Sequence, residues 1–207
     1  MDFRSNTLNT AGLFTARLIA LLALAAIAAQ YLVTAGDHPG DAPQQVAWIM
    51  LRYFTILTSL ASLLSFATMA VTRRALGGWW LGGLAVWEVM TGLVYHLLLS
   101  VDRDGLALWA DHGLHTALPL AVFAWWAVFA RKSRAALGFA ISWLIWPALY
   151  ILYALLRGRA DGIYPYFFLD PGKVRWDGVA VWSGMVGLGF LVAGLLLAGV
   201  ARLIRRG

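Results

Sequence analysis

The sequence predicts an all-α fold, a polytopic integral-membrane bundle of six transmembrane helices, and three observations lead to that prediction. Of the 207 residues, 61% are hydrophobic and only 13% are charged, whereas a soluble domain carries roughly 25% charged residues. Six stretches reach the length of about 20 mostly apolar residues that a membrane helix needs. The basic residues gather at the ends of these stretches, more on one side than on the other. We expect a single transmembrane domain over residues 1–207.

The composition excludes several classes of protein. The apolar fraction is too high for a disordered chain. The absence of cysteine excludes a disulfide scaffold, a zinc–thiolate site and a cysteine nucleophile. The net charge of +6 would suit nucleic acid, but membrane topology accounts for it, so no nucleic-acid partner is expected. We also expect no cofactor and no bound metal.

Each expected helix is an apolar stretch between polar or basic residues. The end of the first stretch, Ala28-Ala29-Gln30, resembles a signal-peptide cleavage site, but the apolar run continues through Val33, so we expect a retained helix. The second ends before Arg73 and Arg74, and the third begins after them. A basic cluster separates the fourth from the fifth, and the sixth runs into the basic C-terminus. The expected helices lie at 12–35, 46–72, 79–101, 108–130, 135–156 and 177–204, with a long loop at 157–176.

The distribution of basic residues predicts the orientation. Nine lie on the side of the termini: Arg4, Arg73, Arg74, Arg131, Lys132, Arg134, Arg202, Arg205 and Arg206. Five lie on the opposite side: Arg103, Arg157, Arg159, Lys173 and Arg175. The positive-inside rule therefore places both termini in the cytoplasm, and we expect a multi-pass protein of a bacterial inner membrane. The long loop runs against the rule, which suggests another role for its charges.

Polar side chains inside hydrocarbon are costly, so each one is a functional hypothesis. The expected second and fourth helices both start on the outer side. At 1.5 Å per residue, Thr55 lies about 13 Å and His115 about 10 Å from that side. His96 and Tyr153 approach the same level from the third and fifth helices, whereas Glu88 lies near the midplane. The polar residues thus collect in the outer leaflet, beneath the long loop.

The helical faces agree with these depths. Arg52, Thr55, Ser59 and Ser62 share one stripe of the second helix. On the fourth helix, Asp111 and His112 both lie within one turn of His115. A threonine hydroxyl that faces a histidine is the minimum for base-assisted nucleophilic catalysis. The carboxylate of Asp111 has three candidate partners, which are His115, His112 and Arg52.

Structural roles compete with these functional ones. Intramembrane Ser and Thr usually bond their own helix or pack against neighbours. Arg52 is able to snorkel to the interface, Glu88 to remain a neutral core group, and Tyr153 to anchor the interface. His115 is harder to explain structurally, because the ring of Pro119 frees the carbonyl of His115 from its helical hydrogen bond.

Three segments carry a resemblance to a known family: RYFTILTS at 52–59, DHGLHTALP at 111–119, and WLIWPALYILYALLRG followed by YPYFFLD within 143–170. Together they resemble the androgen-induced protein family, the family of the androgen-induced hydrolase and the androgen-dependent TFPI-regulating protein, and its bacterial six-span relatives. The resemblance implies a threonine hydrolase that cleaves fatty acid esters of hydroxy fatty acids. It gives Thr55 the role of nucleophile and His115 the role of base. The chain departs from the family pattern at two positions. It has Ser59 where bacterial members often have asparagine, and Asp111 where animal members have asparagine.

The leading hypothesis is therefore an integral-membrane hydrolase of lipid esters. Its expected partners are the surrounding membrane lipids and a lipid ester substrate that enters from the bilayer. Candidate oxyanion donors are Arg52, His112, Tyr153 and the polar stripe, with Ser59, Glu88, His96 and Asp111 as further support. In the long loop, Arg157 and Arg159 are candidates to bind a headgroup. Tyr164 and Tyr166 are candidates for a lid at the interface.

Two non-enzymatic hypotheses remain. His96, His112 and His115 are candidate axial ligands for a haem in an electron-transfer bundle. Glu88 and Arg52 are candidates for a charge relay in a transporter or lipid-binding protein. The sequence leaves the natural substrate and the oligomeric state open.

Overall fold

The protein is an all-helical bundle of six membrane-spanning segments, as a computed structural model shows for residues 6–132 and 136–206. Six helical segments of this part of the chain are long and apolar enough to cross a bilayer: Thr10–Asp37, Phe54–Thr72, Gly78–Leu99, Gly105–Phe129, Gly138–Asp161 and Pro171–Ile204. The expected fold class is confirmed, and the chain is a multi-pass integral membrane protein. Arg4 and Arg134 lie outside the described residues.

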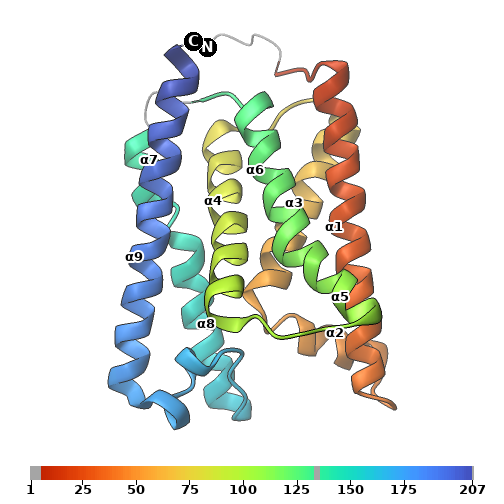
Figure 1. The fold of residues 1–207 in the computed structure, drawn as a ribbon, viewed down its shortest axis with the longest axis vertical. Helices are drawn as coiled ribbons and strands as arrows, with labels where there is room; N and C mark the ends of the chain where they lie inside the picture. Colours follow the sequence, from red (N-terminus) through yellow and green to blue (C-terminus); the bar gives the residue numbers. More distant parts are fainter. Residues whose placement is uncertain (1–5, 133–135, 207) are drawn as a thin grey trace.

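The segments follow one another up and down through the bundle (Figure 1). The helices are α1 (Thr10–Asp37), α2 (Pro43–Met50), α3 (Phe54–Thr72), α4 (Gly78–Val94), α5 (Gly105–His112), α6 (Leu118–Phe129), α7 (Ala136–Ser142), α8 (Ile145–Asp161) and α9 (Pro171–Arg206). Single π-helical turns, Tyr95–Leu99 and Gly113–Ala117, extend α4 and join α5 to α6. The first helix packs against α3 and α5, so it is an integral part of the bundle.

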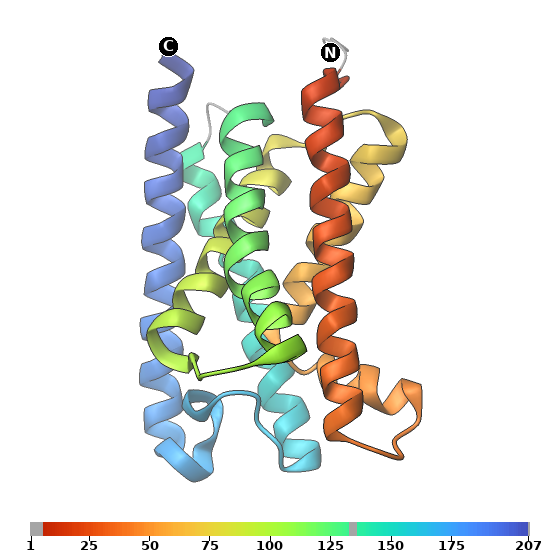
Figure 2. The ribbon, with the colours of Figure 1, turned by 45° about the vertical axis from the view of Figure 1, so that its right-hand side comes forward.

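Both ends of the described chain lie at the same end of the bundle (Figures 1 and 2). The segment before α1 pairs there with the α3–α4 connection, where Leu8 N donates to Arg73 O at 2.9 Å and Ala75 N donates to Asn6 O at 2.7 Å. This end carries Arg73, Arg74 and the basic residues after α6, so the positive-inside rule predicts that it faces the cytoplasm. The helix α2, the α4–α5 connection and the α8–α9 loop lie at the opposite end.

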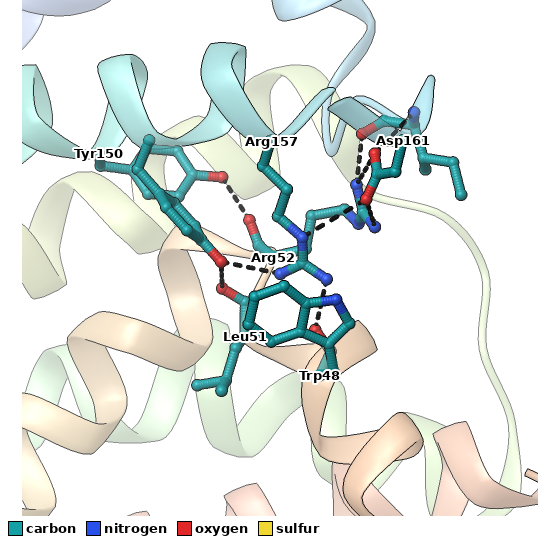
Figure 3. Close-up of polar contacts among 8 residues, drawn as sticks. Trp48, Leu51, Arg52, Tyr150, Arg157 and Asp161 are labelled. Atoms are coloured by element: carbon teal, nitrogen blue, oxygen red, sulfur yellow. Dashed lines mark hydrogen bonds and ion pairs between the residues drawn. The ribbon is translucent and has the colours of Figure 1, made fainter. Parts of the chain in front are cut away.

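The expected continuous helix at 46–72 is wrong, because the chain breaks between α2 and α3 at residues 51–53. No glycine or proline stands at this break. The cause lies in α8, whose side chains satisfy the carbonyls that the break frees (Figure 3). The hydroxyl of Tyr150 donates to Arg52 O at 2.9 Å, that of Tyr153 to Leu51 O at 3.1 Å, and Arg157 Nη2 to Trp48 O at 2.7 Å. A broken helix is tolerated in a membrane where protein groups replace its lost bonds.

The other expected boundaries also shift. The expected helix at 135–156 is two helices, α7 and α8, and α8 continues to Asp161. The last helix begins at Pro171 with a kink at Arg175, whose φ is 60°. The expected loop at 157–176 is therefore wrong in extent, and residues 162–170 are what remains between α8 and α9. Arg157 belongs to a helix, which changes its role.

A tryptophan at the break between α7 and α8 fixes the position of α4. The indole of Trp143 lies so close to Gly82 and Gly83 that a Cβ on Gly82 would stand 2.5 Å from the ring. Its Nε1 donates to Trp79 O at 2.9 Å, and its own carbonyl accepts from Trp87 Nε1 at 2.9 Å. Since α4 carries the residues that support the candidate site from one side, this contact helps to hold the site in place.

Candidate active site

A cavity of about 440 Å³ lies in the half of the bundle opposite the termini. Residues from the end of α1, the start of α3, the end of α4, α5, α8 and α9 line it, together with the loop after α8. Much of the wall is apolar, with Met90, Ile151 and Phe190 among its residues, while Thr55, His115 and Asp111 form a polar part. An apolar cavity with a few converging polar groups is the usual form of a small-molecule site.

The structure brings Thr55 and His115 together within this cavity. Thr55 is the second residue of α3, so the break after α2 places it at a helix N-terminus rather than in mid-helix. Its Oγ1 lies 3.3 Å from His115 Nε2, across 60 residues of sequence. This distance is slightly longer than a tight hydrogen bond, and catalytic pairs are often loose without substrate. The pair has the geometry of a nucleophile and its base.

Asp111 belongs to the same cluster, and its partner is His115. The Nδ1 atom of His115 lies 3.2 Å from Asp111 Oδ1 and 3.1 Å from the Asp111 carbonyl oxygen. A proton on Nδ1 directed at these acceptors leaves the lone pair on Nε2, where it faces Thr55. Of the three candidate partners left open by the sequence, the structure selects His115. Thr55, His115 and Asp111 are therefore arranged as a triad.

Two π-helical turns hold the imidazole of His115 from behind. Tyr95, in the first turn, stacks on His115 with ring centroids 3.7 Å apart and planes at 11°. His115 itself lies in the second turn, four residues before Pro119. Proline lacks the N–H that would otherwise bond the carbonyl of His115. The freed carbonyl lies against Gly92, where a Cβ would be 2.8 Å from the oxygen. Stacking and close backbone packing thus fix the ring that the triad needs, and π-turns often mark functional sites.

Arg52 and Arg157 have structural roles outside the triad (Figure 3). Arg52 is buried and makes a bidentate pair with Asp161, with distances of 3.0 and 2.7 Å, and it also donates to Ile163 O. Hydrogen bonding to Asp161 raises the pKa of the Arg52 guanidinium above its usual value. Arg157 stacks over Trp48, with its guanidinium carbon 3.9 Å from the ring centroid. Groups of the protein thus engage both guanidinium groups, and a role of Arg52 as oxyanion donor or of Arg157 as headgroup site stays a prediction.

This ion pair predicts a measurable effect on stability. Asp161→Asn removes the charge that balances buried Arg52 and weakens the anchor of the loop after α8. We expect Tm of the detergent-purified protein to fall by about 5 °C, since a hydrogen bond to a charged group is worth about 1.5–3 kcal/mol. Asp177→Asn is the matched control, because its pair with Arg175 is 75% and 86% exposed and contributes little. Equal Tm values for both variants would show that the pair between Arg52 and Asp161 does not anchor the loop.

The two tyrosines of the expected lid differ in environment. Tyr164 packs its ring against Gly158 of α8, where a Cβ would stand 2.4 Å away. Tyr166 lines the cavity, stacks on Phe168, and accepts a hydrogen bond from the Phe54 N–H at 3.1 Å. Burial raises the pKa of the Tyr166 hydroxyl to about 12, while the hydrogen bond from the Phe54 N–H acts in the opposite direction. The hydroxyl therefore stays protonated at neutral pH.

The remaining candidates lie apart from the triad. Of the described histidines, His38 and His115 line the cavity, whereas His96 and His112 do not. His96 Nε2 pairs with Thr116 Oγ1 at 3.0 Å, and His112 is exposed. The three histidines proposed for haem thus have separate environments. No group of three or more His, Cys, Asp or Glu side chains suited to a metal occurs among the described residues.

Three further candidates, Glu88, Ser59 and Arg159, also lie outside the triad. Glu88 and Ser59 are fully buried in the core, and Glu88 accepts a hydrogen bond from Ser62, so Glu88 and Arg52 have separate partners. Arg159 is exposed near the end of α8. The expected stripe loses Arg52, which lies before α3, while Thr55 lines the cavity and Ser59 and Ser62 are buried in the core.

Sequence reasoning missed two residues that support this site and one contact made by a third. Tyr95 was one aromatic among many, and only its stack on His115 distinguishes it. Asp161, the partner of Arg52, is 109 residues away in sequence, and no spacing rule joins such residues. Tyr166 was recognised as part of the loop motif, but its contact with the start of α3 was not. The YPY motif at residues 164–166 was the sequence feature that pointed to this loop.

Comparison with protein-family models, with curated proteins and with solved structures found no match to this chain.

Proposed function

We propose that this protein is an integral-membrane hydrolase of lipid esters that uses Thr55 as its nucleophile. The observation that carries the proposal is the Thr55 Oγ1 to His115 Nε2 distance of 3.3 Å, with Asp111 on the other ring nitrogen, inside a largely apolar cavity. The segments that resemble the androgen-induced family support the same assignment. They favour fatty acid esters of hydroxy fatty acids as the substrate class and a bacterial inner membrane as the location.

The reaction has two balanced halves. His115 Nε2 takes the proton of the Thr55 hydroxyl while Oγ1 attacks the ester carbonyl carbon. The tetrahedral intermediate collapses, the ester C–O bond breaks, and the alcohol leaves with the proton from Nε2. Water then gives a proton to Nε2 and attacks the acyl-threonine. The bond between the acyl carbon and Oγ1 breaks, Nε2 returns the proton to Oγ1, and the fatty acid leaves. Asp111 keeps the imidazole in the required tautomer throughout.

The surroundings of the triad suit a lipid. The cavity wall beyond the triad is rich in aliphatic and aromatic side chains, which match acyl chains. Exposed leucines and valines cover the outer faces of α1, α8 and α9, where bilayer lipid would lie. The substrate would enter sideways from the bilayer, with its ester at the depth of Thr55. The water for the second half of the reaction would come from the outer face.

Chemical labelling tests the proposal directly. Treatment of the purified protein with a fluorophosphonate should give one covalent adduct, which mass spectrometry should locate on Thr55. A lipid ester added in excess should slow the labelling. An adduct on another cavity hydroxyl, such as that of Ser183, or the absence of any adduct in a folded protein, would contradict the proposal.

A further inference from the structure

The loop after α8 places one tyrosine hydroxyl beside the nucleophile. The YPY motif starts just after Gly162, whose φ of 77° reverses the chain at the end of α8. The ion pair between Arg52 and Asp161, and the bond from Arg52 to Ile163 O, tie this reversal to the break before α3. The loop and the N-terminus of α3 are therefore held as one unit, and Tyr166 is the residue that crosses between them.

The hydroxyl oxygen of Tyr166 acts as an acceptor at the start of α3. Its oxygen accepts from the Phe54 N–H at 3.1 Å, and Phe54 is the residue before Thr55. Since the oxygen accepts at this bond, the phenolic proton is available to a different acceptor. A backbone N–H that donates to a hydroxyl also strengthens that hydroxyl as a donor. Tyr166 and Thr55 line the same cavity, so an acceptor bound there is within its reach.

Negative charge is favoured at this place. Attack by Thr55 puts charge on the ester carbonyl oxygen, and His115 already occupies one side of the nucleophile. Thr55 lies in the first turn of α3, where N–H groups have no helical partner and the helix dipole is positive. The Tyr166 hydroxyl, which bonds the N–H of the residue before Thr55 and lines the same cavity, adds a donor there. This combination is what stabilises oxyanions in acyl transfer.

We propose that the Tyr166 hydroxyl donates a hydrogen bond to the carbonyl oxygen of the scissile ester and to the oxyanion that forms when Thr55 attacks. The inference rests on the proposed function and adds a catalytic residue to it. The donors considered from the sequence have other partners: Arg52 binds Asp161, and Tyr153 donates to Leu51 O. The role of Tyr166 involves no net proton transfer, so the balance of the reaction is unchanged.

The test is the kinetics of Tyr166→Phe on a soluble chromogenic fatty acyl ester. We expect kcat to fall by about 10²–10³-fold with KM nearly unchanged, the effect of removing one oxyanion donor. The phenyl ring keeps the stack on Phe168, at 5.1 Å between centroids, so the fold should persist. Tyr164→Phe is the matched control from the same loop and should retain the wild-type kcat, because Tyr164 packs against α8 through its ring.

A second substitution separates a catalytic role from a structural one. Replacement of Tyr166 by 2,3,5-trifluorotyrosine keeps the hydroxyl but makes it more acidic. The alkaline limb of the kcat profile should then move to lower pH, because only the protonated phenol donates. An unchanged alkaline limb, or a wild-type kcat in Tyr166→Phe, would overturn the role of Tyr166 and leave Thr55 as the nucleophile. Absence of Thr55-dependent turnover in the wild-type protein would instead overturn the proposed function itself.

Discussion

Thr55→Ala should abolish ester turnover, with a loss of about 10⁴-fold or more, and should remove the fluorophosphonate adduct. Removal of a nucleophile leaves only the catalysis due to binding and charge stabilisation, which accounts for the size of the effect. His115→Ala should lose a similar amount, because the two residues act as one unit across their 3.3 Å contact. Turnover of the purified variants in detergent is the measurement.

The controls for this experiment come from the same helix. Thr55→Ser keeps a hydroxyl at the start of α3 and should retain measurable activity and labelling. Thr72→Ala should behave as the wild type, since the Thr72 hydroxyl bonds only the Thr68 carbonyl at the exposed end of α3. Tm values close to that of the wild type would show that these proteins are folded. Full turnover by a folded Thr55→Ala variant would refute the mechanism.

Asp111→Asn should lower kcat by about 10²–10³-fold. An asparagine amide is able to donate to Nδ1, and this tautomer puts a proton on Nε2, where Thr55 needs an acceptor. We expect a smaller loss than in triads that depend on the carboxylate alone, because the Asp111 carbonyl oxygen also lies 3.1 Å from Nδ1 and survives the substitution. Steady-state kinetics with the same ester give the value.

Asp102→Asn is the control for the loss of one acidic residue on this side of the bundle, because Asp102 is exposed in the α4–α5 connection and should be neutral in effect. Wild-type kcat in Asp111→Asn would mean that the backbone carbonyl alone orients His115. The family that the sequence resembles has asparagine here in its animal members. The result therefore measures what the aspartate of this chain adds.

Much of the fold could be predicted from the sequence for a simple reason. A bilayer requires long apolar helices, so six such stretches define the spans, and the structure has a helix of sufficient length at each one. Depth along a helix follows from a fixed rise per residue, so the common level of Thr55 and His115 was also predictable. Local spacing placed Asp111 within one turn of His115 but could not choose its partner.

The sequence by itself determined the membrane class, the number of spans and the depth at which polar residues collect, because all three depend on local composition and helix geometry. Only the tertiary structure decided the break between α2 and α3, since the groups that stabilise it belong to α8, about 100 residues later. It also paired Arg52 with Asp161 and brought Tyr166 to the start of α3. These contacts join distant segments, and they follow from packing rather than from any pattern within one segment.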